Sequence, residues 1–146
     1  LMRTPALLEE IARRVVEATK ELDAAIEKTQ RALRNTLSDD TGRWILGAHQ
    51  EAHCEWALTV HEEQARHYVI DRSFVDDDGI RWIVDYKTGD HQGGDRDRFL
   101  DEELERYRAQ LENYGHILAQ LDDRPIRLAL YFPLLAAWRT WDHRSC

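Results

Sequence analysis

The first third of the chain is dominated by apolar residues at helical spacing. Thr4 and Pro5 match an N-cap followed by proline at the first helical position. The residues that would share one face of the following helix are apolar: Leu8, Ile11, Val15, Ala18, Leu22, Ile26 and Leu33. The opposite face mixes Glu, Lys and Arg, which favours a solvated helix over one that contacts DNA. The pattern predicts a long amphipathic helix over residues 5–36, followed by a loop over residues 38–42.

The periodicity then changes from helical to alternating. Residues 54–60 place Cys, Trp, Leu and Val on one face and Glu, Ala and Thr on the other, which predicts a strand. Residues 64–75 contain a second strand, and Asp76 to Gly79 form a hairpin turn. Residues 80–88 are nearly all β-formers. We expect them to form a third strand that is buried on both faces except at its end.

A second amphipathic helix and a further strand complete the pattern. Leucines and tyrosines at helical spacing predict a helix over residues 97–121, which Pro125 ends. Residues 126–132 predict a fourth strand, and residues 134–141 fit either a short helix or another strand. We therefore expect one α/β domain, with a central mixed sheet of about four to five strands flanked by helices and a long N-terminal helix.

The composition is that of one ordinary domain. The chain has 146 residues, of which 42% are apolar and 33% are charged, and this is enough for a real core. No apolar run is long enough to span a membrane, so we expect no membrane partner. Two cysteines are too few for a disulfide framework, which favours a reducing, cytoplasmic setting. Both ends look arbitrary, so we expect the chain to be a fragment of a larger protein.

Acidic residues are concentrated in the middle of the chain. The formal net charge is -8, and residues 71–105 hold twelve acidic and five basic residues. The net charge argues against a purely electrostatic grip on nucleic acid, which needs Lys and Arg. A local excess of acid fits either a solvated face or a divalent-cation site, where the ion inverts the local charge.

Asp85 and Lys87 are the centre of the candidate chemistry. They lie two residues apart in the predicted third strand, so both side chains project from one face near its end. Pairing about the Asp-Gly turn brings Asp71 close to Asp85. Two carboxylates in one site repel unless a proton or cation separates them, and hard oxygen ligands select Mg²⁺ or Mn²⁺. With a lysine beside them, the set predicts metal-assisted phosphodiester hydrolysis. The alternative is a cross-strand ion network that includes Arg72.

Three segments together resemble a known nuclease family. Ile-Asp-Arg at 70–72, Trp-Ile-Val-Asp-Tyr-Lys-Thr-Gly at 82–89 and Gln-Leu-Glu-Asn-Tyr at 110–114 are similar to the PD-(D/E)XK nuclease domains of RecB- and AddA-type helicase-nucleases. The similarity covers about residues 52–141 and implies a restriction-endonuclease-like core there. Residues 1–37 would be an N-terminal helical segment of the same domain.

The resemblance implies a metal centre. Residues 1–146 would form a single nuclease domain in which Asp71 and Asp85 bind Mg²⁺ or Mn²⁺ and Lys87 is the catalytic lysine. The carbonyl of Tyr86 would supply a further metal ligand. Glu55, in the strand that precedes Asp71, matches a glutamate of many relatives and is carried over as a metal ligand.

The resemblance also implies how DNA is handled. Gln110 and Tyr114, four apart on one helix face, match the family motif that faces the active site and the DNA. The expected partners are DNA and helicase motor domains in the same or a partner chain, and the expected activity is exonucleolytic. Val69 departs from the glycine that many relatives carry, and the upstream histidine ligand of the family is not assigned within the chain.

Two other functions stay open from the sequence. One is a non-catalytic nuclease-like module that guides DNA or docks a subunit, against which the intact Asp71, Asp85 and Lys87 argue. The other is a stand-alone nuclease with a different substrate, such as RNA. His49 and His53 have the spacing of a zinc-binding helix pair but lack a third ligand, which favours surface histidines.

Overall fold

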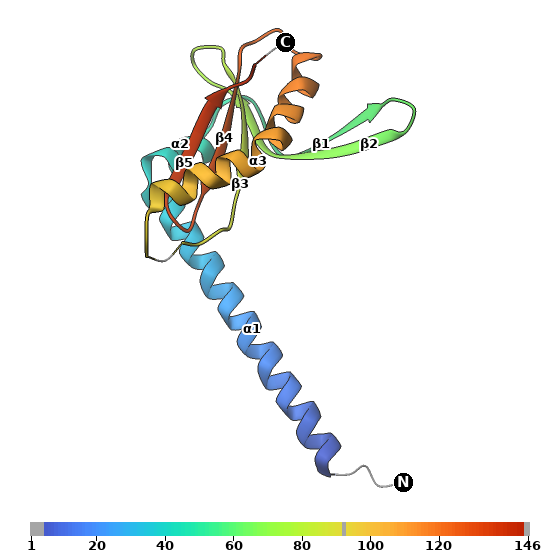
Figure 1. The fold of residues 1–146 in the computed structure, drawn as a ribbon, viewed down its shortest axis with the longest axis vertical. Coiled ribbons are helices and arrows are strands. Elements are labelled where there is room, and N and C mark those ends of the chain that lie inside the picture. Colours follow the sequence, from blue (N-terminus) through green and yellow to red (C-terminus); the bar gives the residue numbers. More distant parts are fainter. Residues whose placement is uncertain (1–4, 92, 145–146) are drawn as a thin grey trace.

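The computed structural model describes residues 5–91 and 93–144. Within them the elements follow in the order α1 (Pro5–Ser38), α2 (Asp40–Leu46), β1 (Gln50–His61), β2 (Ala65–Val75), β3 (Arg81–Tyr86), α3 (Arg96–Ala119), β4 (Ile126–Phe132) and β5 (Ala137–Asp142) (Figure 1). Every predicted helix and strand is present within a few residues. The segment that fitted a helix or a strand is the strand β5, and a short helix, α2, begins inside the predicted loop.

The described strands form one five-stranded sheet in the order β1-β2-β3-β4-β5. Neighbouring strands are antiparallel except β3 and β4, which are parallel. A parallel pair needs a long crossover connection, and α3 provides it. The mixed sheet, its flanking helices and the long N-terminal helix confirm the α/β fold class expected from the sequence.

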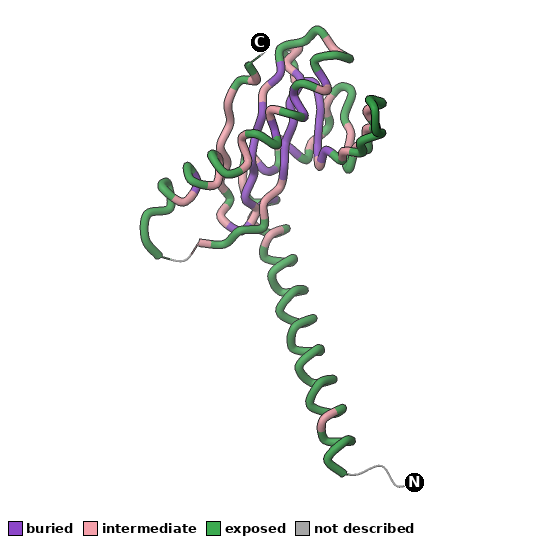
Figure 2. Tube along the Cα trace, turned by 45° about the vertical axis from the view of Figure 1, so that its right-hand side comes forward, coloured by how far each residue is buried: buried purple, intermediate pink, exposed green. Residues whose placement is uncertain are grey.

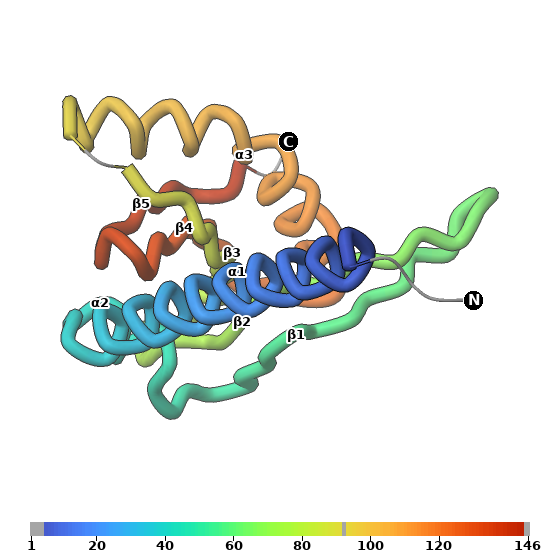
Figure 3. Tube along the Cα trace, turned by 90° about the horizontal axis from the view of Figure 1, so that it is seen from below, coloured from blue at the N-terminus to red at the C-terminus, as the bar shows by residue number. Residues whose placement is uncertain are grey.

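The two faces of the sheet carry different helices (Figure 3). α3 covers one face, where Ile83, Leu111 and Phe132 belong to a cluster of fully buried side chains. α2 lies against the other face, where Ile45 and Phe74 belong to a second buried cluster. β3 and β4 lie between the two clusters and are buried along nearly their whole length, which explains their continuous apolar runs.

Asp39 and Gly42 explain why a helix begins where a loop was predicted. The backbone of Asp39 is extended, and its carboxylate accepts the N–H of Gly42 at 3.2 Å, which caps α2. The same carboxylate accepts the hydroxyl of Tyr131 in β4 at 2.8 Å. A Cβ added to Gly42 would lie 2.7 Å from that hydroxyl oxygen. The loop prediction was wrong because Asp and Gly are common in loops. Here Asp39 caps a short helix that contains Gly42, and the Asp39 carboxylate is bonded to Tyr131 of β4.

α1 extends far from the rest of the molecule (Figures 1 and 2). Only its last turns reach the body, where Thr36 is buried and Asn35 Nδ2 donates to the carbonyl of Leu134 at 3.2 Å. The predicted amphipathic pattern is present, but its apolar side chains are exposed over the described chain: Leu7, Leu8, Ile11, Val15, Val16, Leu22, Ile26, Leu33 and Leu37.

Candidate active site

β3 positions the central residues of the candidate site. Arg81, Ile83 and Asp85 alternate along it and face α3, because Ile83 belongs to the cluster on that side. Asp85 is only 6% exposed. The backbone N–H of Lys87, just beyond the strand, donates to the carbonyl of Tyr131 in β4 at 2.9 Å. The parallel neighbour therefore holds the backbone that carries both charged side chains.

The Asp-rich turn between β2 and β3 fixes which residues face each other. The N–H of Asp76 donates to the carbonyl of Ile80 at 3.0 Å, and the Asp76 carboxylate accepts the indole N–H of Trp82 at 2.8 Å. Gly79 has a φ of 78°, a left-handed value that glycine adopts without strain. Burial alone would raise the pKa of Asp76, but the hydrogen bonds from Trp82 and the Ile80 backbone hold it below its usual range. Asp76 thus stabilises the turn itself.

The register set by this turn brings Asp71 to Asp85. Arg72 pairs with Val84, so Asp71 lies opposite Asp85. The β2–β3 ladder ends there, and the N–H of Tyr86 donates to Asp71 Oδ2 at 2.9 Å instead of to a strand carbonyl. Since the N–H and C=O of a strand residue point to the same side, the carbonyl of Tyr86 is also directed toward Asp71. The two carboxylates and this backbone segment therefore lie together, as the sequence analysis expected.

The ammonium of Lys87 lies between a carboxylate and an aromatic ring. Its Nζ is 2.6 Å from Asp85 Oδ2 and 3.7 Å from the ring centroid of Tyr107 in α3. Both charged side chains are largely buried, which strengthens a cation–π contact. Tyr107 was not among the site residues predicted from the sequence. The available signal was that Tyr107 precedes Gln110 by about one helical turn, which puts the two on the same side of α3.

The pKa of the Asp85 carboxyl group is raised above its ordinary value. Burial raises its pKa to about 6; the Lys87 ammonium opposes this shift, and the charge of Asp71 adds to it. Lys87 contacts Asp85 Oδ2 as an ion pair, but this buried oxygen has no partner in hydrogen-bond geometry among the described residues. The Lys87 ammonium therefore already meets the charge on this oxygen, at 2.6 Å, while burial still opposes its ionisation.

Gln110 and Tyr114 are joined to each other on α3. Gln110 Nε2 lies 2.9 Å from the hydroxyl oxygen of Tyr114, and the Tyr114 ring meets Tyr68 of β2 edge to face at 6.3 Å. Tyr114 is buried and Gln110 is exposed. In the described residues no hydrogen bond connects this pair to Asp71 or Asp85. The structure brings the two helix residues together about one and two turns beyond Tyr107, along the same helix that covers the carboxylates.

Glu55 occupies an unusual position in β1. The pairs Cys54–Arg72 and Trp56–Ile70 place it opposite Asp71 in the ladder. Its side chain is exposed and its φ is 46°. Across residues 5–91 and 93–144, no group of three or more His, Cys, Asp or Glu side chains is arranged to hold a metal ion.

His49 and His53 do not share a helix. His49 contacts the carbonyl of Trp44 through Nε2 and stacks on Phe74 with ring centroids 3.9 Å apart. His53 lies in β1 and stacks on Trp56 at the same centroid distance. The two rings therefore have separate aromatic partners.

No family model matches this chain, and no curated protein sequence matches it either. Among the helices that the structure describes, none is long and apolar enough to cross a membrane. A functional conclusion therefore depends on the geometry of the site and on the motifs that form it.

Proposed function

We propose that this protein is a metal-dependent deoxyribonuclease of the PD-(D/E)XK type. The observation that carries the proposal is the convergence of two carboxylates and an ammonium, from Asp71, Asp85 and Lys87, at the end of a buried strand. Burying such charges is costly, and perturbed carboxylates of this kind cluster at functional sites. The resemblance of the motif segments to RecB- and AddA-type nucleases supports the same reaction.

The resemblance also supports the setting in which the enzyme acts. We propose exonucleolytic cleavage of DNA in the cytoplasm, together with helicase motor domains in the same or a partner chain. A restriction-endonuclease-like core belongs to this same proposal. The motor and its partner surfaces would supply much of the positive charge that this acidic chain lacks for binding phosphates.

Carboxylate oxygens are hard ligands of the kind that Mg²⁺ and Mn²⁺ prefer, which supports the proposed metal. Asp85 Oδ2 lies 2.6 Å from the Lys87 ammonium. Asp71 uses Oδ2 for the N–H of Tyr86, so Asp71 Oδ1 is the natural ligand atom of that residue. Mg²⁺ commonly takes one or two carboxylates together with substrate phosphate oxygens, a smaller set than most metal centres need. Asp71, Asp85 and the Tyr86 carbonyl would hold the ion. When bound, such an ion acidifies a water molecule and neutralises charge on the phosphate.

The remaining residues of the site act on the substrate and on each other. Lys87, as an ammonium, would orient the attacking water or stabilise the charge that develops on the phosphate. Tyr107 limits where the ammonium lies, because Nζ rests 3.7 Å from the centre of its ring. Gln110, which is exposed further along α3, would contact the DNA strand, and the buried Tyr114 would hold the Gln110 side chain in place through its hydroxyl. Glu55 is the weakest member of the proposed ligand set, since its side chain is exposed.

A non-catalytic module that docks another subunit is the second candidate, and one observation favours it. The large apolar side chains of α1 from Leu7 to Leu37 are exposed, and Figure 2 shows nearly the whole helix in the colour of exposed residues. An exposed apolar surface of this extent is typical of an interaction site. Docking through α1 does not exclude catalysis. DNA cleavage that depends on Asp71 and Asp85 therefore distinguishes the nuclease from the non-catalytic module.

The test is cleavage of end-labelled single- and double-stranded DNA with Mg²⁺ or Mn²⁺. The variants Asp85→Ala and Lys87→Ala should abolish cleavage, as should EDTA. Asp77→Ala is the matched control, because Asp77 is an exposed turn residue, and it should cleave like the wild type. Products that shorten progressively from one end would identify an exonuclease. Cleavage that persists in Asp85→Ala would contradict the proposed site.

A further inference from the structure

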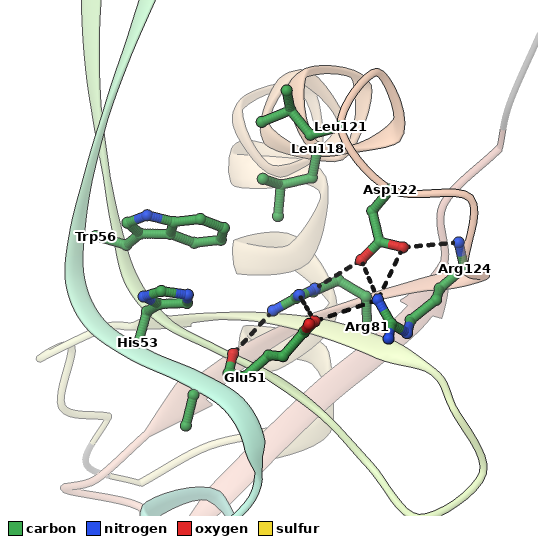
Figure 4. Close-up of a pocket in the computed structure, with 9 residues that line it drawn as sticks. Glu51, His53, Trp56, Arg81, Leu118, Leu121, Asp122 and Arg124 are labelled. Atoms are coloured by element: carbon green, nitrogen blue, oxygen red, sulfur yellow. Dashed lines mark hydrogen bonds and ion pairs between the residues drawn. The ribbon is translucent and has the colours of Figure 1, made fainter.

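A pocket lies at the opposite end of β3 from the carboxylates (Figure 4). Its volume of about 530 Å³ is within the range of small-ligand sites. Arg81, the first residue of β3, lines it, and Asp85 lies four residues further along the same face of the strand. At the rise of an extended strand the two are separated by about 13 Å. The pocket and the candidate active site therefore lie on the face of the sheet that α3 covers.

Two aromatic rings form one side of this pocket, and two leucines form another. His53 and Trp56 in β1 are stacked with centroids 3.9 Å apart and planes 8° from parallel. Residues three apart in a regular strand face opposite sides. Glu55 lies between His53 and Trp56 in the chain and has a positive φ, which puts both rings on one side of β1. Leu118 at the end of α3 and Leu121 just after it face the pocket from the other side (Figure 4).

The polar edge of the pocket is a balanced set of two cations and two anions. Arg81 donates to the Glu51 carboxylate at 2.8 Å and lies 3.3 Å from Asp122. Arg124 lies 3.2 Å from Glu51 and 3.1 Å from Asp122. Arg81 is buried, whereas Glu51 and Arg124 are about half exposed. This edge therefore offers solvent both a hydrogen-bond donor and an acceptor, without net charge.

We propose that this pocket binds one nucleobase of a single-stranded nucleic acid. A base has flat π-faces that stack on aromatic side chains and an edge that carries both donors and acceptors. The outer face of the His53–Trp56 stack offers the first feature, and the Glu51–Arg124 edge offers the second. A phosphate group would instead meet the carboxylates of Glu51 and Asp122. The strand is single, because base pairing would occupy the edge that the pocket recognises.

The inference rests on the proposed nuclease function, since a nucleic-acid substrate is what brings bases to this face of the sheet. It extends that function by naming a subsite remote from Asp85 that would hold the strand. A free nucleotide presents the same base, so the experiment must separate the two sources.

The experiment follows the indole N–H of Trp56 by NMR in the full chain carrying Asp85→Asn, with EDTA present to prevent cleavage. The Trp56→Phe variant assigns the signal. The probes are the four deoxynucleoside monophosphates, a short single-stranded oligodeoxynucleotide, the corresponding duplex and 2-deoxyribose 5-phosphate, which lacks a base. We expect the nucleotides and the single strand to shift the Trp56 signal, and the duplex and the sugar phosphate to leave it in place.

Variants of the pocket wall test the assignment without disturbing the core. His53→Ala and Leu121→Asp should each weaken single-strand binding at least about fivefold, the loss expected for one stacked base. Leu121 is 69% exposed, so its replacement leaves the fold intact. The matched controls are His61→Ala, in the exposed end of the hairpin, and Leu8→Asp, on α1. Both should bind like the parent.

The outcomes separate this proposal from the nuclease function. A shift caused equally by 2-deoxyribose 5-phosphate would overturn the base pocket in favour of an anion site. Cleavage by the wild type without any Trp56 shift would overturn the pocket and leave the nuclease standing. A shift without wild-type cleavage would support the pocket alone. Equal affinity for a nucleotide and the oligonucleotide would support base binding, with free nucleotides as the source.

Discussion

The carboxylate of Asp85 is buried, lies beside the like-charged Asp71 and forms an ion pair with Lys87. Lys87 favours its ionised form, while burial and Asp71 disfavour it, and the net result is a pKa of about 6. A negative charge on Asp85, at the end of β3, is therefore unfavourable in the folded protein. A divalent cation would relieve it, because the ion stabilises both carboxylates in their ionised form.

The stability of the metal-free protein should depend on the protonation of Asp85. The folded-state pKa of about 6 exceeds the ordinary value of 3.8, so the folded state binds the proton more tightly than the unfolded state does. This contribution is fully present below pH 3.8 and is lost as the pH rises through about 6. Its size is at most about 3 kcal/mol.

Urea unfolding of the wild type and Asp85→Asn in EDTA, from about pH 4.5 to about pH 7, measures this contribution. Over that range the wild type should lose unfolding free energy relative to Asp85→Asn. Parallel curves for the two proteins would show that Asp85 has an ordinary pKa in the folded state.

Tyr107 should position Lys87 through its ring and not through its hydroxyl. A desolvated cation–π contact contributes on the order of 1–2 kcal/mol, so Tyr107→Leu should slow DNA cleavage about 5- to 30-fold at saturating substrate. Tyr107→Phe keeps the ring and should cleave at close to the wild-type rate. Equal losses in the two variants would instead point to a role for the hydroxyl.

At the scale of elements, α2 depends on one capping residue. The Asp39 carboxylate accepts both the N–H of Gly42 and the hydroxyl of Tyr131, so it joins the start of the helix to the centre of the sheet. Asp39→Ala should lower the unfolding free energy by about 1–2 kcal/mol. Asp40→Ala is the control, because its only described ion pair is an exposed one with Arg43 and its loss should cost under about 1 kcal/mol. Urea denaturation would measure both, and equal losses would contradict the capping role.

The crossover through α3 is the element that assembles the candidate site. α3 runs from the end of β3 back to the start of β4, so Tyr107 lies over Lys87 and Leu118 lies by the pocket at Arg81. One helix thus covers the carboxylates and also forms a wall of the proposed base pocket. An extended strand bound along α3 would contact both places.

At the scale of the whole molecule, α1 is separate from the folded body. Its only buried residue is Thr36, near its end. Deleting residues 5–28 should therefore change the melting temperature by less than about 3 °C, because no core packing is removed. Differential scanning calorimetry would measure this. A larger drop would show that α1 packs against the body in solution.

The sequence by itself predicted every helix and strand except α2, with β5 left open between a helix and a strand, and it predicted that Asp71 lies close to Asp85. Hydrophobic periodicity located the helices and strands, because burial on one face or both imposes that periodicity. The Asp-Gly turn fixed the hairpin register, and that register alone places Asp71 opposite Asp85. The two-residue spacing of Asp85 and Lys87 placed both side chains on one face.

Only the tertiary structure decided what lies over that face. The order of the strands and the course of α3 bring Tyr107 onto Lys87 and bury Asp85, which raises the pKa of its carboxyl group. The start of α2 and the pocket beside Arg81 likewise depend on side chains far apart in the chain, such as Asp39 with Tyr131. Local periodicity carries no information about such contacts, because long-range packing and desolvation are properties of the assembled sheet.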